Sequence, residues 1–202
     1  MKFRWVTKGK LLYLPHNQLK PCMKILKYIF VAVVAIIAIP LILALFVRND
    51  YQVKREVVIN KPKAEVFNYV RFLKNQDNFS VWNMKDPNSE RTYKGTDGTV
   101  GFVYGWNSQM DEVGEGEQEI MNITEGERID MMLRFKRPFE SNDTAYFETN
   151  EVSPSQTKLV WGFSGGMPYP MNIMLLFMDM DAMLGPELDK GLTNLKGVME
   201  KQ

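Results

Sequence analysis

Twenty consecutive residues without a charge, YIFVAVVAIIAIPLILALFV at positions 28–47, limit what the whole chain can become. At ~1.5 Å of rise per residue, a helix of this length spans ~30 Å, the thickness of the hydrocarbon core of a bilayer. A buried helix of a soluble core is usually shorter and carries a polar stripe, which this stretch lacks. We therefore predict one transmembrane helix over residues 25–48, with Pro40 as a tolerated kink.

A cleaved secretory signal peptide is the alternative interpretation of this stretch. Its apolar region would be about 7–15 residues long and would end in small residues of the A-x-A kind. Here the apolar stretch is longer and ends in Ala44-Leu45-Phe46-Val47-Arg48. The sequence favours an uncleaved anchor over a cleaved signal.

Basic residues flank the apolar stretch asymmetrically. The residues that precede it include no acid and seven bases: Lys2, Arg4, Lys8, Lys10, Lys20, Lys24 and Lys27. The first charges after the stretch are mixed in sign. The positive-inside rule predicts a single-pass protein with a cytoplasmic N-terminus and an external domain, periplasmic in a bacterium. We interpret residues 1–24 as a short basic cytoplasmic tail, with Met23 as an alternative start.

The rest of the chain is acidic and lacks two of the most reactive residue types. Residues 49–202 hold 17 Lys/Arg and all 24 Asp/Glu, a net charge of −7, which argues against a nucleic-acid partner. The only histidine and the only cysteine, His16 and Cys22, both precede the apolar stretch. Histidine- or cysteine-dependent catalysis, His-type zinc sites and intrachain disulfides are thereby excluded for residues 49–202. We predict no metal and no cofactor.

Alternating apolar and polar residues predict a sheet. The clearest case is 127–137, where Ile129, Met131, Leu133 and Phe135 alternate with polar side chains. In 113–124, Glu115, Glu117 and Glu119 share one face, which we interpret as solvated rather than as a metal or catalytic site. The predicted strands are 51–59, 89–94, 99–106, 113–124, 127–137, 143–152 and 157–163.

Helices are predicted before and after the main series of strands. Asn60-Lys61-Pro62 is a typical helix start, and the apolar period continues to about Leu73. Residues 74–80 predict a second helical turn. A long helix is expected over 169–201, with a kink or break at Gly185-Pro186. These elements predict one α+β domain over 51–202, in which the last helix covers a curved antiparallel sheet.

Several segments resemble the SRPBCC family (START-related, polyketide cyclase/dehydrase and lipid-transport domains). They are VKREVVINKPKAEVFNYV (53–70), GTDGTVGFVYGW (95–106), GEGEQEI (114–120), GERIDMMLRF (126–135) and TKLVWGFSG (157–165). The resemblance extends from Tyr51 to Lys201. It implies a helix-grip fold, a seven-stranded antiparallel sheet around a long C-terminal helix, with an apolar cavity for lipids or other hydrophobic molecules. It implies no shared catalytic motif.

The sequence is rich in methionine and aromatic residues. The chain has 14 Met, 12 Phe, 8 Tyr and 4 Trp, and methionines gather between Met167 and Met183. Flexible methionines and aromatic rings suit a hydrophobic pocket with a few polar anchors, although each also suits an ordinary core. The predicted cavity residues are Trp82, Phe102, Tyr104, Trp106, Gln118, Met131, Leu133, Phe135, Trp161, Phe163, Met174, Phe177 and Met178.

Three functions remain open on the sequence. The first is a membrane-anchored module that binds a hydrophobic small molecule or lipid between the sheet and the last helix. The second is a cyclase- or hydratase-type enzyme that uses a cavity carboxylate or tyrosine, for which Asp130 and Glu148 are candidates that nothing singles out. The third is a structural domain with a closed core, which meets protein partners through an apolar patch over residues 171–183.

Overall fold

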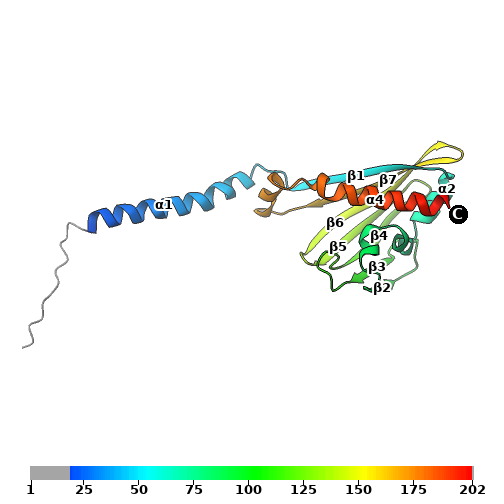
Figure 1. Cartoon of the computed structure of the whole chain (residues 1–202), viewed down its shortest axis with the longest axis horizontal. Helices are drawn as coiled ribbons and strands as arrows, with labels where there is room; N and C mark the ends of the chain where they lie inside the picture. Colours follow the sequence, from blue (N-terminus) through cyan, green and yellow to red (C-terminus); the bar gives the residue numbers. More distant parts are fainter. Residues whose placement is uncertain (1–18, 202) are drawn as a thin grey trace, which may run out of the picture.

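The computed structural model describes residues 19–201, so most of the predicted cytoplasmic tail lies outside the described residues. Helix α1 (Leu19–Ala44) projects away from the remaining elements (Figure 1). Its residues Lys24–Ala44 are long and apolar enough to cross a membrane, and only the last of them, Ala44, is buried against the rest of the chain. The helix runs through Pro40 and ends before the expected Arg48, because the chain turns after Ala44.

The seven predicted strands form one antiparallel sheet, which confirms the predicted fold class. Its order is β1-β7-β6-β5-β4-β3-β2. Register shifts in the β4–β5 and β6–β7 pairs mark β-bulges, which increase local twist and help to bend a sheet. The strands are β1 (Asp50–Ile59), β2 (Glu90–Lys94), β3 (Val103–Asn107), β4 (Glu115–Thr124), β5 (Arg128–Arg137), β6 (Ser141–Ser153) and β7 (Gln156–Gly166).

Three short helices carry the chain from β1 at one edge of the sheet to β2 at the other. They are α2 (Lys63–Val70), the 3-10 helix η1 (Leu73–Asn78) and α3 (Val81–Lys85). The expectation that Asn60 caps the first helix is wrong. Pro62 holds the cap position without a side-chain hydrogen bond, and the Asn60 Oδ1 atom accepts a hydrogen bond from Gln156 Nε2 at 2.8 Å.

The closing helix, α4 (Met180–Glu200), is shorter than predicted. The stretch from Tyr169 does not join it, because Asp179 begins the helix by accepting a hydrogen bond from Ala182 N to its Oδ1 atom at 3.0 Å. The preceding residues form a separate 3-10 helix, η2 (Met171–Leu176). Pro186 does not break α4.

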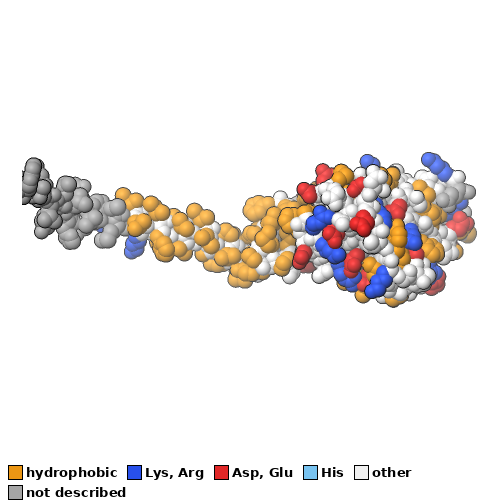
Figure 2. All heavy atoms as spheres, turned by 90° about the horizontal axis from the view of Figure 1, so that it is seen from below, with side chains coloured by type: hydrophobic (Ala, Val, Ile, Leu, Met, Phe, Trp, Pro, Cys, Tyr) orange, Lys and Arg blue, Asp and Glu red, His pale blue; other side chains and the backbone are white. Residues whose placement is uncertain are grey.

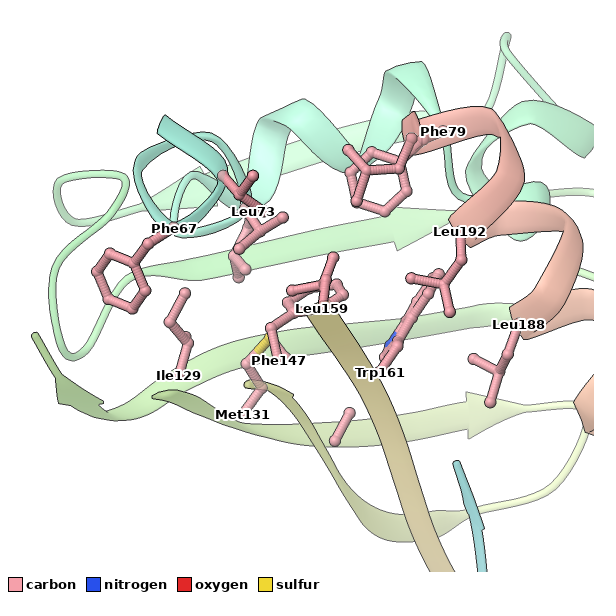
Figure 3. Close-up of a cluster of buried hydrophobic side chains, with 14 of the residues drawn as sticks. Phe67, Leu73, Phe79, Ile129, Met131, Phe147, Leu159, Trp161, Leu188 and Leu192 are labelled. Carbon is pink, nitrogen blue, oxygen red and sulfur yellow. The ribbon is translucent and has the colours of Figure 1, made fainter. Parts of the chain in front are cut away.

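Helix α4 lies along the sheet and closes the core (Figure 1). Side chains from the helices and from β5, β6 and β7 point toward one another, among them Phe79, Phe147, Trp161 and Leu192 (Figure 3). Gly191 permits this close approach, because a Cβ atom there would lie 2.8 Å from the Trp161 ring. The buried core includes Val66, Phe67 and Val70 of α2, whereas the remaining hollow is bordered by residues of β3 to β7 and of α3 and α4.

Ion pairs reinforce the attachment of α4 to the sheet. The guanidinium group of Arg55 on β1 donates to Asp181 at 2.8 Å and to Asp189 at 3.0 Å.

Ion pairs also cover the outer face of the sheet, where Arg134 contacts Glu117 at 3.0 Å and Glu119 at 2.6 Å. The Glu115–Glu119 series therefore lies on a solvated, charge-paired face, as the alternation predicted.

Candidate ligand cavity

A cavity of about 260 Å³ lies between the concave face of the sheet, α3 and the first half of α4. Sheet residues that line it lie opposite one another in the register, as in the pair Tyr104–Gln118 and the pair Gln118–Leu133. Period-two alternation places these side chains on one face, so the strand pattern itself forms the wall. Leu184 and Leu188 of α4 form the opposite wall.

Eight of the thirteen predicted cavity residues surround this single hollow. Their positions in the sequence range from α3 to β7, and the antiparallel register brings them together. They are Trp82, Tyr104, Trp106, Gln118, Leu133, Phe135, Trp161 and Phe163.

Two predicted residues lie in the packed core instead of the cavity. Phe102 and Met131 are each only 1% exposed and neither lines the hollow. Phe102 stacks on Tyr93, with ring centroids 6.4 Å apart. Met131 Sδ lies 2.8 Å from Gln118 Nε2, so it supports a cavity residue from behind. Alternation predicted the correct face for both, but it does not tell packed positions from hollow ones.

Three further predicted residues, Met174, Phe177 and Met178, lie outside the cavity because α4 begins only at Met180. Phe177 is 85% exposed and Met174 is 39% exposed. They belong to the segment that connects β7 to α4, beside the end of α1. The expectation that the methionine cluster lines the ligand cavity is wrong for this part of the chain.

Aromatic rings make up much of the cavity wall. Trp82 meets Trp161 edge to face, with centroids 6.1 Å apart and an interplanar angle of 83°. Trp106 meets Phe135 in the same manner at 5.8 Å and 73°. The Trp106 indole donates its Nε1 proton to Val113 O at 3.1 Å, which satisfies the buried nitrogen. These contacts fix the positions of the rings in the cavity wall.

A polar group of side chains closes one end of the cavity. Tyr104 donates its hydroxyl proton to Asp77 Oδ1, and Asn83 Nδ2 donates to the same carboxylate oxygen at 2.9 Å. Arg91 holds this end in place by donating to Asn83 O at 3.1 Å. Burial, together with the Asp77 hydrogen bond, raises the pKa of Tyr104. The phenol therefore stays protonated at neutral pH and is a poor general base.

Gln76 is the polar residue that sequence reasoning missed and that matters most here. Its side chain lines the cavity, is 5% exposed, and leaves its Nε2 group without a hydrogen-bond partner among the described residues. A buried amide without a partner costs about 1–3 kcal/mol. Gln76 lies in a polar stretch that predicted only a helical turn, so no local signal showed that it would face the hollow.

The other missed residues come from α3, from strands β2, β5 and β6, from loops and from the closing helix. They are Ser80, Asn83, Arg91, Glu112, Val113, Arg137, Pro138, Ala145, Leu184 and Leu188. Arg137 Nη2 donates to Asn107 Oδ1 at 2.6 Å and so fixes the rim beside β3. Charged residues lie at the rim and apolar residues lie inside, so the hollow has a polar entrance and an apolar interior.

Neither candidate acid from the sequence lines this cavity. Asp130 and Glu148 instead accept hydrogen bonds from Arg128, at 2.7 Å and 3.2 Å. Elsewhere on the sheet, burial raises the pKa of Asp143. Burial, with a contribution from the charge of Asp143, also raises the pKa of Tyr51 to about 12.

Among the described residues, no group of three acid, histidine or cysteine side chains is placed to hold a metal ion.

The curved seven-stranded sheet, the long closing helix and the hollow between them define a helix-grip protein. Solved structures with the same fold include ginseng major latex-like protein 151 from Panax ginseng, with 13% identity and a TM-score of 0.55 over 75% of this chain and 99% of that one. A protein from Thermobifida fusca matches with 19% identity and a TM-score of 0.52, over 74% of this chain and 93% of that one. Ara h 8.0201 matches with 13% identity and a TM-score of 0.50, over 76% and 99% of the two chains. The sequence matches no family model and no curated protein.

Proposed function

We propose that this chain is an SRPBCC-type binding protein that holds a small hydrophobic molecule in the cavity and is anchored in a membrane by residues 25–48. The observation that carries the proposal is an aromatic-walled hollow of about 260 Å³ inside a domain that is otherwise closely packed. Folding normally removes voids, because an unfilled apolar cavity costs about 24 cal/mol per Å³. A ligand bound in this aromatic-walled hollow would offset the free-energy cost of leaving it unfilled.

The size and polarity of the hollow describe its ligand. Ligand pockets usually measure about 300–1,000 Å³, so this one suits a short acyl chain or a single ring system rather than a whole phospholipid. Burial of such a ligand contributes about 25 cal/mol per Å² of apolar surface. The free Nε2 group of Gln76 favours a ligand with one hydrogen-bond acceptor, such as a carbonyl or carboxylate oxygen.

The membrane part of the proposal rests on α1. Apart from its last residue, Ala44, the apolar helix exposes its side chains, and water is a poor solvent for them. The basic residues before it favour a cytoplasmic N-terminus and an external domain. An anchored cavity would sample apolar molecules that concentrate in the bilayer.

Intrinsic fluorescence offers a direct test, because Trp82, Trp106 and Trp161 all line the cavity. The full chain, with Trp5→Phe to remove the fourth tryptophan, is placed in lipid nanodiscs and titrated with a brominated octanoic acid. We expect saturable quenching that unlabelled octanoic acid reverses. Quenching that grows in proportion to the acid in the lipid, without saturation, would refute a binding cavity.

A further inference from the structure

The segment between β7 and η2 and on to α4, residues 167–178, is apolar and exposed; we call it the junction segment. It contains no charged residue. Tyr169 is 52% exposed, Leu176 56% and Phe177 85%. Phe46, just after α1, is 84% exposed. Figure 2 shows hydrophobic side chains gathered where α1 meets the domain, continuous with those along the helix.

The junction segment is fixed to the end of α1 by hydrogen bonds. Asn172 is 3% exposed, and its Nδ2 group donates to Ala44 O at 2.7 Å and to Val47 O at 2.9 Å. Met167 N donates to Asn49 O at 2.8 Å. The last carbonyls of a helix have no partner within the helix, and in an apolar medium an unpaired carbonyl is costly. Asn172 provides a partner for Ala44 O, the last carbonyl of α1.

The short connection after α1 also limits how far the segment can be from a bilayer. Residues 45–49 separate α1 from β1. Fully extended, five residues reach at most about 18 Å, and the hydrogen bonds of Asn172 keep the connection compact. If α1 spans a membrane, the exposed apolar side chains of the junction segment therefore lie at the level of the headgroups.

We propose that the junction segment is a membrane-embedded foot, which seats the domain in the interfacial region of the outer leaflet. This inference depends on the membrane anchor proposed above. Aromatic and apolar side chains favour the boundary between headgroups and acyl chains. Charged residues follow both apolar parts, at Arg48 and Asp50 after α1 and at Asp179 and Asp181 after the junction segment. This pattern fits an apolar foot that enters the bilayer and is bordered by charged residues that stay in water.

A lipid surface suits the segment better than a protein partner does. The exposed patch continues directly from an apolar helix whose side chains are exposed from Lys24 to Leu43, with only Ala35 and Ala38 partly covered. A second copy of the chain or another protein would have to cover the patch while lipid surrounds the adjoining helix. The bilayer covers both with one continuous apolar medium.

Depth-dependent fluorescence quenching tests the foot in the full chain. In a Cys22→Ser background, single cysteines replace Phe177, Ile36 or Val152 and carry an environment-sensitive fluorophore. Ile36 lies within α1 and is 71% exposed; Val152 is 54% exposed, near the β6–β7 turn at the far end of the domain (Figure 1). The protein is placed in phosphatidylcholine vesicles that contain lipids with nitroxides at a shallow or a deep position of the acyl chain.

The three positions separate the possible outcomes. We expect deep quenching at 36, predominantly shallow quenching at 177 and none at 152. No quenching at 36 would overturn the membrane anchor itself. Quenching at 36 without quenching at 177 would overturn the foot alone. A fluorophore at 177 that becomes shielded without lipid quenching would also overturn it and would indicate a protein or a second copy as the occupant.

Discussion

Filling the cavity from the sheet side tests the proposed function without removing a polar group. Ala145 on β6 lines the hollow and is 5% exposed. Leucine adds three carbons there, worth about 2.4 kcal/mol at ~0.8 kcal/mol each. Ordering the leucine side chain costs about 0.5–1 kcal/mol, so Ala145→Leu should stabilise the domain by about 1.5 kcal/mol. In a core that is already full, the same change would destabilise the protein by about 1–3 kcal/mol.

The sign of the effect is therefore the measurement. Urea unfolding of the full chain in detergent gives the free energy of unfolding, and the brominated-acid titration gives binding. Ala64→Leu, at an exposed position of α2, is the matched control and should change neither quantity appreciably. We expect Ala145→Leu to raise stability and abolish saturable quenching. A loss of stability, or unchanged binding, would show that the hollow is not an empty ligand site.

Three other changes address single features of the domain. Gln76→Leu should weaken binding of octanoic acid about 3–10-fold while sparing an apolar probe without an acceptor, as competitive displacement would show; equal losses would contradict the assigned role. Gly191→Ala should displace Trp161 and reduce saturable quenching, whereas Gly197→Ala, with open space around it, should raise the urea midpoint through about 0.8–1 kcal/mol of helix propensity. Asp143 has a raised pKa in the folded state, so its contribution to stability is present below pH 3.8 and is lost as pH rises through the folded pKa. Asp143→Asn should therefore gain more stability relative to wild type at pH 7 than at pH 4 in urea titrations, and a difference independent of pH would contradict this reasoning.

The sheet was predictable because period-two alternation is a local property of each strand. In β5, Ile129 and Met131 turn inward and Arg128 and Asp130 turn outward, as the pattern indicates. The strand ends were less predictable. Residues 99–102 were expected in a strand, but Gly101 has a φ of 84° and the chain turns before β3 begins at Val103. The apolar and polar residues around Gly101 still alternate as in a strand. The alternation therefore does not reveal the turn, which depends on the positive φ of this glycine.

The cavity was predictable in its location but only partly in its residues. Rows of side chains on the inner face follow from alternation, so Tyr104, Gln118 and Leu133 could be assigned to one wall. The polar end could not be assigned, because Gln76 and Asn83 come from the short helices η1 and α3 between β1 and β2. Their placement depends on how short helices pack across the sheet, and no periodic pattern records that packing.

The methionine-rich stretch shows why composition alone misplaced three residues. Residues 159–178 contain no charge, so nothing in their composition separates side chains that face the cavity from side chains that face outward. Here it serves two environments: Trp161 and Phe163 face the cavity, whereas Phe177 faces outward beside α1. The point of change is set by Asn172, whose amide reaches the end of α1, and by Asp179, which starts the closing helix. Asn172 within this stretch and Asp179 directly after it thus determine which side chains face a ligand and which we expect to face lipid.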